Sequence, residues 1–403
     1  MRAKEHSDES SILHNSQFIL PDAWFRLMPR VLQIYKDYCP PIFGGIEKHL
    51  SLLCNRLSSV LDVDVLVANR RLRTELDFID GIKVTKVGTL GRFFSAPLSP
   101  LFGYYLGRER YDVLHFHLPN PTAVLSYLLV RPSGRVVVTW HSDIVRQAKF
   151  IPLYRPFLLR FLSLCDVIFP TSERYAGSSP FLRRFLSKCH AIPLGIDVTR
   201  LSPTGRVAEK ALELRARFGN RIVLFVGLLR YYKGLKFLID AMQNLDAKLV
   251  IVGEGPMRGE LEGYCKARQL RDKIFFAGAV DEWVLPAYYH SSDVFCLPSV
   301  YRSEAFGVCQ LEAMACSKPV VSTALDSGVP FVNLDGKTGL IVPPMDSTAL
   351  SAAIGRLLSD EELAARLGRF ARDRVLAKFT ADRMAQSVLA AYRRLFWDGV
   401  MRG

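Results

Sequence analysis

Two glutamates flank a glycine in the segment Ser303–Glu312, which reads SEAFGVCQLE. Glu304 and Glu312 lie eight positions apart, and an apolar pattern begins just after Gly307. We expect a carboxylate on a loop, a turn at the glycine, and a helix whose second turn carries the other carboxylate. The N-terminus of such a helix directs backbone N–H groups and the positive end of its dipole at one point. The segment therefore suits a ligand with both phosphate and hydroxyl groups, such as a sugar nucleotide.

Other candidate groups follow predicted strands. Gly44 and Gly45 precede a helical pattern, so either they let backbone approach a phosphate or they form a tight strand-to-helix turn. They do not form a GxGxxG dinucleotide fingerprint. Arg230 and Lys233 stand in the loop 227–234, where fixed cations suit a diphosphate, although a solvated basic loop explains them too.

Three histidines and one loop valine also end predicted strands. His141 directly follows a strand, a position that faces the crevice in a doubly wound domain. Its alternative role is a histidine satisfied by loop backbone. His115 and His117 end another strand, and we interpret both as structural, with at most one pointing at a common site. Val280 closes a segment whose backbone amides are candidates to pair with a nucleobase edge.

Short β-branched runs alternate with helical stretches throughout the chain, which predicts parallel sheets with crossover helices. The expected strands are 30–35, 62–68, 84–87, 112–116, 135–140, 166–170, 222–226, 248–252, 274–277, 294–297, 319–322 and 340–342. A cluster of Pro, Gly and Asp at Ile192–Asp197 predicts a linker between two halves. Two doubly wound, Rossmann-like domains facing a central cleft would place a ligand at the carboxyl ends of both sheets.

We expect a disordered extension over residues 1–28, an N-terminal domain over 29–195 and a C-terminal domain over 196–380. The last helix, about residues 381–403, is expected to pack back on the N-terminal domain. The N-terminus lacks the apolar core of a signal peptide, and no apolar run approaches the ~18 residues that a spanning helix needs. A cytoplasmic location follows as an expectation.

The net charge of +14 is concentrated in residues 1–195, which hold 25 Lys and Arg against 16 Asp and Glu. Such an excess indicates an anionic partner: nucleic acid, a phospholipid surface or a phosphorylated substrate. No nucleic-acid-binding motif is present, which disfavours the first. The eight cysteines contain no CxxC pair, which argues against zinc and against a disulfide scaffold and favours buried, reduced thiols.

The segment Ile151–Cys165 is strongly apolar, with Arg155 and Arg160 interleaved. Two interpretations stay open. A helix of the core has this pattern, and so does a surface that docks on anionic lipid at the inner face of the cytoplasmic membrane.

Taken together, the motifs closely resemble the retaining glycosyltransferases of family 4, which have the two-domain GT-B fold. The resemblance covers about residues 30–396 and follows the family's order of motifs. The matching segments are Gly44-Gly45, His141–Asp143, Pro193–Asp197, Lys233-Gly234, Gly253–Pro256, Glu304–Glu312, Thr338–Leu340 and Pro343-Pro344.

The resemblance implies transfer of a sugar from a nucleotide donor with retained anomeric configuration, with no cofactor and no required metal. Glu304 would lie near the donor sugar, His141 would contact it as positive charge develops, and Glu312 would bind the ribose. The two carboxylates are therefore not interpreted as the acid and nucleophile of a hydrolase. The diphosphate would be held by Gly45, Arg230, Lys233 and the amides of Phe306, Gly307 and Val308.

One position departs from the family pattern, because many relatives carry an arginine where this chain has Leu228. Similarity to bacterial enzymes that build polysaccharides on lipid-linked or saccharide acceptors implies mannosyl transfer from GDP-mannose. UDP-sugar donors stay open, as does a GT-B enzyme that does not transfer sugar.

Overall fold

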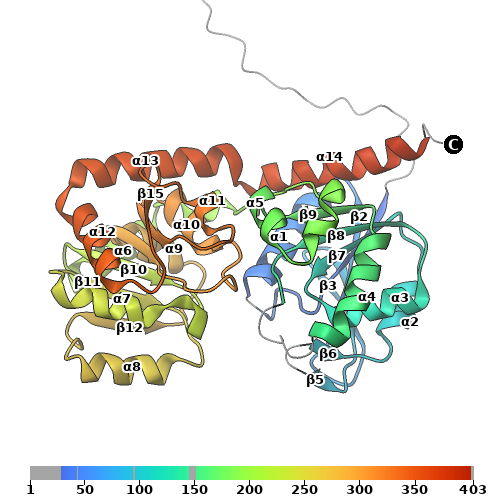
Figure 1. Ribbon diagram of the computed structural model, residues 1–403, viewed down its shortest axis with the longest axis horizontal. Coiled ribbons are helices and arrows are strands. Elements are labelled where there is room, and N and C mark those ends of the chain that lie inside the picture. Colours follow the sequence, from blue (N-terminus) through green and yellow to red (C-terminus); the bar gives the residue numbers. More distant parts are fainter. Residues whose placement is uncertain (1–28, 43, 94–95, 145–150, 401–403) are drawn as a thin grey trace, which may run out of the picture.

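The computed structural model describes residues 29–42, 44–93, 96–144 and 151–400, with side chains described as far as residue 396. The expected N-terminal extension lies outside this range. Two α/β lobes stand side by side, and the final helices run along the top of both (Figure 1).

The first lobe is built on a seven-stranded sheet. All pairs are parallel except that between β3 and β4. The strands in order across the sheet are β3 (Glu75–Ile79), β4 (Ile82–Val87), β2 (Asp62–Ala68), β1 (Arg30–Ile34), β7 (Val113–Leu118), β8 (Arg135–Trp140) and β9 (Val167–Pro170). A small hairpin, β5 (Gly91–Phe93) and β6 (Ala96–Leu98), lies apart from it.

The second lobe is built on a six-stranded, fully parallel sheet. Its strands in order across the sheet are β12 (Ile274–Gly278), β11 (Lys248–Val252), β10 (Ile222–Val226), β13 (Val294–Leu297), β14 (Val320–Thr323) and β15 (Gly339–Val342). The strands are buried along nearly their whole length, as the continuous apolar runs predict.

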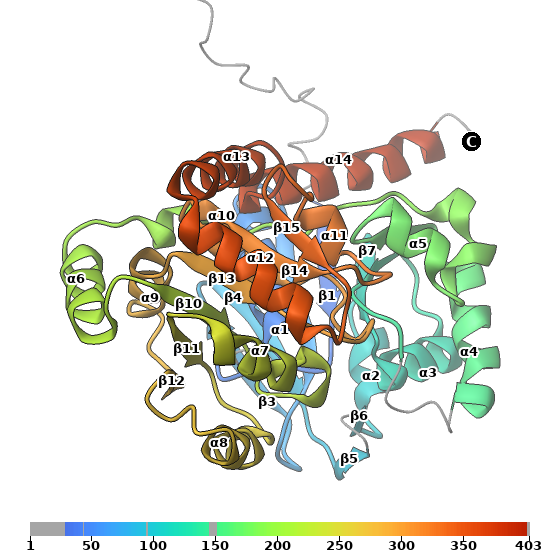
Figure 2. The ribbon, with the colours of Figure 1, turned by 60° about the vertical axis from the view of Figure 1, so that its left-hand side comes forward.

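Helices cover both faces of each sheet (Figures 1 and 2). Those of the first lobe are α1 (Gly45–Leu57), α2 (Phe102–Gly107), α3 (Pro121–Val130), α4 (Ile151–Leu164) and α5 (Glu173–Ser178). The second lobe has α6 (Arg206–Phe218), α7 (Leu235–Ala241), α8 (Arg258–Ala267), α9 (Leu285–Ser291), α10 (Val308–Ala315), α11 (Val329–Val332), α12 (Ser347–Ser359) and α13 (Glu361–Lys378).

The chain passes between the lobes twice, and the two passages pair with each other. Ile196 donates to the carbonyl of Phe379 and accepts from Ala381, both at 2.9 Å. A Cβ at Gly195 would lie 2.4 Å from the Thr380 carbonyl oxygen, so this close approach requires glycine. Beyond it, α14 (Ala381–Val400) returns to the first lobe, where Met384, Ala385, Val388 and Tyr392 join the core beneath α1.

In each sheet the strand order reverses at one point, where a doubly wound domain places its ligand. The reversal lies between β1 and β7 in the first sheet and between β10 and β13 in the second. Residues singled out from the sequence lie on or after these strands. His117 lies on β7, Lys233 follows β10, and Glu304 follows β13.

The predicted fold class is therefore confirmed, and five of the twelve expected strands have the same ends in the structure. All eight cysteines are free and six are buried. No helix among the described residues is both long and apolar enough to span a membrane. The structure contains three strands that the sequence patterns did not indicate, β3, β5 and β6, all at an edge or outside the main sheet.

Candidate active site

Lys233 and Glu304 form a buried ion pair at the switch point of the second sheet. The lysine Nζ lies 2.5 Å from Glu304 Oε2, and the two side chains are 8% and 9% exposed. Ser299 Oγ donates a second hydrogen bond to the same carboxylate oxygen at 2.9 Å. Burial on its own lowers the pKa of Lys233, but the adjacent Glu304 carboxylate outweighs it, so the Lys233 pKa lies above its usual value. The lysine is therefore a fixed cation.

Glu304 leads directly into the N-terminus of α10. Gly307 is the N-cap with φ of +74°, and a Cβ there would lie 2.6 Å from Leu297 Cδ2. The turn therefore needs glycine. The Phe306 side chain is buried and its ring lies 6.1 Å from that of Phe379, so only its backbone can contribute to a ligand site. The free N–H groups of this first turn, including that of Val308, suit an anion.

Glu312 lies in the second turn of α10, as expected. Its carboxylate accepts a hydrogen bond of 2.6 Å from the Tyr289 hydroxyl. Burial raises the pKa of Glu312, and the Tyr289 hydrogen bond opposes that shift. The two glutamates of one segment thus have different partners, a lysine for Glu304 and a tyrosine for Glu312.

The glycine pair of the first lobe begins α1. A Cβ at Gly44 would meet Glu47 Oε2, whereas a Cβ at Gly45 would meet nothing within 4 Å. Gly44 therefore makes room for a neighbouring side chain, and Gly45 leaves open space at the helix start. Lys48 of the same helix pairs with Glu282 of the second lobe at 2.9 Å. The N-terminal turn of α1 thus lies against the loop that carries Val280.

His141 is buried at the carboxyl end of β8. Its Nε2 lies 2.9 Å from His117 Nδ1, and its own Nδ1 has no hydrogen-bond partner among the described residues. Burial, followed by the nearby histidines, holds the pKa of His141 well below its usual value, so the ring is neutral at physiological pH. A buried, unpaired ring nitrogen is unusual and calls for a ligand or water.

The interpretation of His115 and His117 is wrong in one respect. Side chains two positions apart on a strand share a face, and these rings are stacked with centroids 4.6 Å apart. His117 and His141 are stacked in turn, with centroids 5.2 Å apart. Both strand histidines therefore belong to one cluster with His141.

His49 of α1 completes a group with metal-binding chemistry. One ring nitrogen from each of His49, His117 and His141 lies within 4.8 Å of the others. Burial lowers the pKa of His49 to about 4, and neither of its nitrogens has a hydrogen-bond partner among residues that the structure describes. Both nitrogens of His117 are already engaged, by Gln33 at 2.8 Å and by His141. A metal would have to displace the hydrogen bond between His117 and His141.

A direct contact between the lobes joins the surroundings of the two predicted catalytic residues. Arg302 Nη2 donates to Asp143 Oδ2 at 2.9 Å, while Asp143 Oδ1 accepts from Trp140 and Ser179. Asp143 is two residues from His141, and Arg302 is two residues from Glu304. The structure therefore brings the two segments together across the interface.

Two residues predicted to contact the donor, Arg230 and Val280, lie at the margin of the site formed by Lys233, Glu304 and α10. Arg230 is exposed and forms no ion pair within the described part of the chain, in contrast to the buried Lys233. Leu228, at the position where the resemblance implies an arginine, is 47% exposed. Val280 is partly buried and packs against the core of the second lobe.

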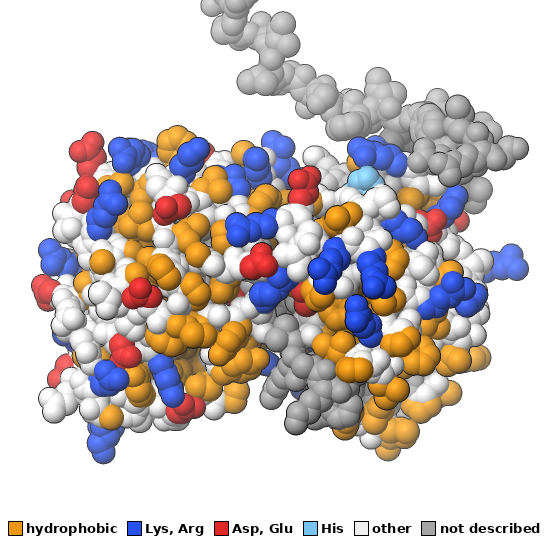
Figure 3. Space-filling view, in the orientation of Figure 1, with side chains coloured by type: hydrophobic (Ala, Val, Ile, Leu, Met, Phe, Trp, Pro, Cys, Tyr) orange, Lys and Arg blue, Asp and Glu red, His pale blue; other side chains and the backbone are white. Residues whose placement is uncertain are grey.

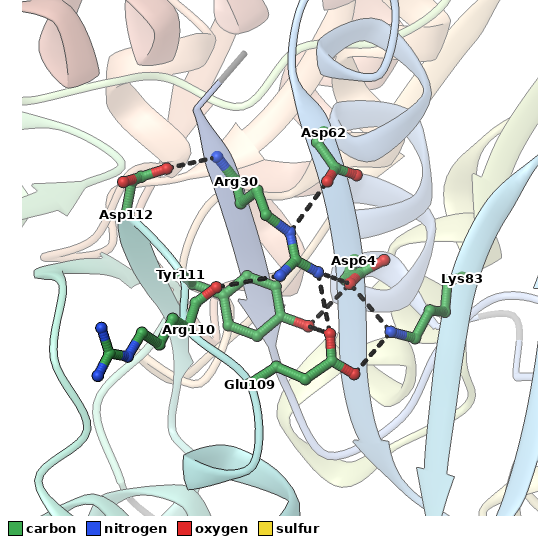
Figure 4. Close-up of polar contacts among 8 residues, drawn as sticks. All are labelled: Arg30, Asp62, Asp64, Lys83, Glu109, Arg110, Tyr111 and Asp112. Atoms are coloured by element: carbon green, nitrogen blue, oxygen red, sulfur yellow. Dashed lines mark hydrogen bonds and ion pairs between the residues drawn. The ribbon is translucent and has the colours of Figure 1, made fainter. Parts of the chain in front are cut away.

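A hollow lies at the amino ends of β1, β7 and β8, away from the carboxyl ends that carry this site, and does not belong to it. This cavity of about 730 Å³ is lined by Arg30, Arg110, Arg135 and Phe396, among others. Arg30 pairs there with Asp62, Asp64 and Glu109 (Figure 4). Its cation is already neutralised by carboxylates, so we interpret this network as structural.

Comparison with known proteins agrees with the geometry. Residues 43–200 match the model of Glycosyltransferase Family 4, and residues 210–374 match that of Glycosyl transferases group 1. The chain is 34% identical over 371 residues to O-antigen chain mannosyltransferase C of Escherichia coli, covering 91% of this chain and 98% of that protein. The chain belongs to glycosyltransferase family 4. It is therefore a retaining enzyme that transfers a sugar from a nucleotide donor.

Two further relatives of this family 4 glycosyltransferase are informative. It is 36% identical over 357 residues to the D-rhamnosyltransferase WbpZ of Pseudomonas aeruginosa, covering 87% of this chain and 92% of that protein. Among solved structures, sucrose-phosphate synthase from Thermosynechococcus elongatus superposes with a TM-score of 0.78 at 26% identity, covering 92% of this chain and all of that one. The GT-B fold is thus shown.

Several residues of the site were missed at the sequence level. Arg302 carried no distinguishing pattern beyond its nearness to Glu304, whereas Asp143 stood in the matching segment His141–Asp143 without a role of its own. His49 lies four positions after Gly45, on the same face of α1, which is a usable signal. Gln33 and Tyr392 contact the histidines only through tertiary structure.

Proposed function

We propose that this glycosyltransferase moves mannose from GDP-mannose to a lipid-linked or saccharide acceptor in bacterial surface polysaccharide synthesis. The observation that carries the site is the buried Lys233–Glu304 pair at a switch point, directly before the N-terminus of α10. The choice of mannose is supported by the two relatives named as a mannosyl- and a rhamnosyltransferase. In this proposal, residues 196–380 bind the nucleotide sugar, and residues 29–195, with helix α14, bind the acceptor.

The second lobe supplies most of the proposed donor contacts. The amide N–H groups of Phe306, Gly307 and Val308 donate to the diphosphate oxygens at the helix N-terminus, and Lys233 and Arg230 offset the diphosphate charge. Charge on the departing diphosphate is then stabilised by groups that are already in place.

The other proposed contacts surround the rest of the nucleotide sugar. Gly44 and Gly45 allow the start of α1 to approach the diphosphate from the first lobe. Glu312, held by Tyr289, accepts from the ribose hydroxyls. The backbone near Val280 contacts the base.

At the sugar itself, Glu304 and His141 act from opposite lobes. The bond from the anomeric carbon to the diphosphate oxygen breaks, and a bond from that carbon to the acceptor oxygen forms. The acceptor's proton is taken up by the departing nucleoside diphosphate. Neutral His141 and anionic Glu304 both stabilise the positive charge that develops on the sugar ring. Carboxylate, imidazole and lysine groups supply this chemistry without a required metal.

The experiment that tests the donor uses purified enzyme with a panel of nucleotide sugars. GDP should raise the melting temperature more than UDP, ADP or dTDP, because a ligand that binds only the folded state stabilises it by mass action. GDP-mannose with a mannose-terminated lipid acceptor should then yield a product with retained anomeric configuration by NMR. A preference for UDP with transfer from a UDP-sugar would replace the GDP-mannose assignment.

The second candidate is a GT-B enzyme that acts on the nucleotide sugar without transferring it. Incubation of each donor with and without the lipid acceptor separates the two. A true transferase consumes donor in proportion to the glycosylated lipid that forms. Conversion of the donor that is independent of acceptor would favour the alternative.

We further propose that the enzyme contacts an anionic membrane through a patch on the first lobe. The patch comprises exposed apolar side chains of β6, α2, α3 and α4 and the segment before α2, and Figure 3 shows hydrophobic side chains gathered over this part of the surface. They are Leu98, Leu101, Tyr104, Leu129, Val130, Leu153 and Phe157, of which Leu129 and Leu153 are 86% and 75% exposed. The α4 helix is thus neither wholly core nor wholly surface, because Leu158, Phe161 and Leu162 are buried.

The charges of the elements that carry this patch also favour contact with an anionic membrane. The sequences of β6, α2, α3 and α4 contain no acidic residue, and Arg155 is exposed on α4. Apolar groups beside cations suit anionic headgroups. Enzyme should sediment with phosphatidylglycerol vesicles at low salt and less in high salt. The double variant Leu129→Asp, Leu153→Asp should lose this binding; its sedimentation at the level of the unmodified enzyme would overturn the patch.

A further inference from the structure

The C-terminal helix places one tyrosine deep in the first lobe. Tyr392 of α14 is 1% exposed, although it lies on the last element of the chain. Its hydroxyl lies 2.6 Å from His115 Nδ1 and 3.2 Å from Gln33 Nε2. Helix α14 therefore does more than cover the sheet, because it supplies a polar group to the buried histidines.

From Tyr392 a continuous set of hydrogen bonds leads to His141. Gln33 Oε1 lies 2.8 Å from His117 Nε2, and His117 Nδ1 lies 2.9 Å from His141 Nε2. On the side branch, His115 Nε2 lies 2.7 Å from Thr139 Oγ1. His115, His117 and His141 use all of their ring nitrogens in this network except His141 Nδ1.

The network sets which ring nitrogens carry protons. Burial lowers the pKa of His115 to about 3 and that of His117 well below its usual value, so these rings are neutral and each has one N–H. Gln33 Oε1 only accepts, so His117 Nε2 donates to it and His117 Nδ1 accepts from His141 Nε2–H. His141 Nδ1 therefore carries a lone pair and no proton, and no described residue donates to it.

The same argument assigns the protons at the Tyr392 end of the network. Gln33 Nε2 donates to the Tyr392 oxygen, so the tyrosine proton goes to His115 Nδ1, and His115 Nε2–H donates to Thr139. Turning the Gln33 amide over would reverse every bond between Tyr392 and His141 and would convert His141 Nδ1 into a donor. The amide orientation of Gln33, whose Nε2 donates to the Tyr392 oxygen, therefore decides the hydrogen-bonding character of His141.

We propose that Gln33 and Tyr392 are positioning residues that keep His141 protonated on Nε2, so that Nδ1 accepts a hydrogen bond from a hydroxyl of the sugar. This proposal rests on the proposed function of His141. The unpaired, buried Nδ1 supports it, because such an atom is costly unless a substrate group or water fills its position. His49 and Tyr35 hold the His141 ring from other sides, with centroids at 5.0 and 6.4 Å.

The test combines Tyr392→Phe with enzyme that is ¹⁵N-labelled at histidine. Protonated and unprotonated ring nitrogens have distinct ¹⁵N shifts, and a His141→Gln spectrum assigns the His141 signals. We expect a single Nε2–H form in the unmodified enzyme and a mixture of both forms in Tyr392→Phe. The kcat should fall about tenfold, which corresponds to about 1.4 kcal/mol, with the GDP dissociation constant unchanged. A purely structural role would leave the tautomer unmoved.

Two further variants sharpen the result. Gln33→Glu presents only acceptors to His117, so it should keep the Nε2–H form of His141 and retain more activity than Gln33→Leu. Tyr127→Phe is the matched control, because Tyr127 is a buried tyrosine of the same lobe whose hydroxyl forms no hydrogen bond within the described chain. Its kcat and its His141 spectrum should both stay unchanged.

The outcomes separate this proposal from the proposed function. If no nucleotide sugar is a substrate, the proposed function fails, yet the spectra still report whether Tyr392 sets the His141 tautomer. If transfer occurs but Tyr392→Phe retains the tautomer or the full kcat, the positioning role is overturned while the function stands.

Discussion

Arg302 and Asp143 join the two lobes by a charged hydrogen bond of 2.9 Å. Each lies two residues from a predicted catalytic residue, Arg302 from Glu304 and Asp143 from His141. The Asp143 side chain is 6% exposed and is held on its other oxygen by Ser179 and Trp140. Arg302 also pairs with Asp326 of its own lobe. A contact of this kind couples the relative position of the lobes to that of His141 and Glu304.

The first prediction concerns this contact. Arg302→Ala leaves the Asp143 carboxylate buried without its cation, which disfavours the observed arrangement of the lobes. We expect kcat/KM to fall about tenfold, equivalent to about 1.4 kcal/mol, and the radius of gyration in X-ray scattering to increase. Arg174→Ala is the control, because Arg174 approaches Asp326 at 3.9 Å and is 61% exposed. An Arg302→Ala enzyme with unchanged kcat/KM would show that the contact between the lobes has no role in activity.

The sequence predicts most of the sheet because parallel strands buried on both faces appear as continuous β-branched runs. Strand β3 gave no such signal, since its residues ELDFI alternate between partly and largely exposed positions at an antiparallel edge. The domain arrangement follows from repetition of one unit, which is visible without any tertiary information.

The site was predictable only in part. Glu304, Gly307 and Glu312 are close in sequence, so helix geometry alone relates them. The histidine stack was accessible too, because residues two apart on β7 share a face, and the error lay in the direction assigned to them. Tyr392 was not accessible, since only packing of α14 on the first lobe brings it to His115.

Glu304 is the subject of the second prediction. Glu304→Gln preserves the size of the side chain but removes the charge that holds Lys233 and that, in the proposed function, faces the reacting sugar. We expect kcat to fall by about 10²–10³, the usual effect of removing one electrostatic group from a preorganised site. Circular dichroism should show that the fold is retained.

The matched control for Glu304→Gln is a substitution of Ser299, the other hydrogen-bond partner of the Glu304 carboxylate. Ser299→Ala removes one hydrogen bond to the same carboxylate and leaves the charge in place. Loss of one such bond costs about 0.5–1.5 kcal/mol, so kcat should fall far less than in Glu304→Gln. Near-normal turnover in Glu304→Gln would remove Glu304 from the catalytic assignment.

The third prediction concerns the position at which this chain departs from its relatives. Arg230 is the exposed cation nearest in sequence to Leu228, and we expect Arg230→Ala to raise the KM for the donor about tenfold, equivalent to about 1.4 kcal/mol. Leu228→Arg in the same background should restore affinity if the two positions serve one phosphate. Steady-state kinetics with the donor measures the KM, and isothermal titration with GDP measures the affinity. Failure of Leu228→Arg to restore binding would show that Arg230 does not substitute for the missing arginine.

The last prediction follows from the buried neutral histidines. Burial lowers the pKa of His49 to about 4 and that of His115 to about 3, whereas both titrate near 6.5 in the unfolded chain. Above pH 6.5 both histidines are neutral in the folded and in the unfolded chain, so no stability is lost. Below it the unfolded chain binds more protons than the folded one, so stability falls with pH until the folded pKa values are reached.

Each of these histidines can therefore cost up to about 1.4 kcal/mol per pH unit below 6.5. The melting temperature should be nearly flat from pH 8 to 7 and should fall steeply from pH 6.5 to 5. His49→Phe removes one titrating group and should make the fall shallower, whereas the exposed His190→Ala should leave its slope unchanged. Equal slopes in His49→Phe and the unmodified enzyme would show that the histidine cluster does not control acid stability.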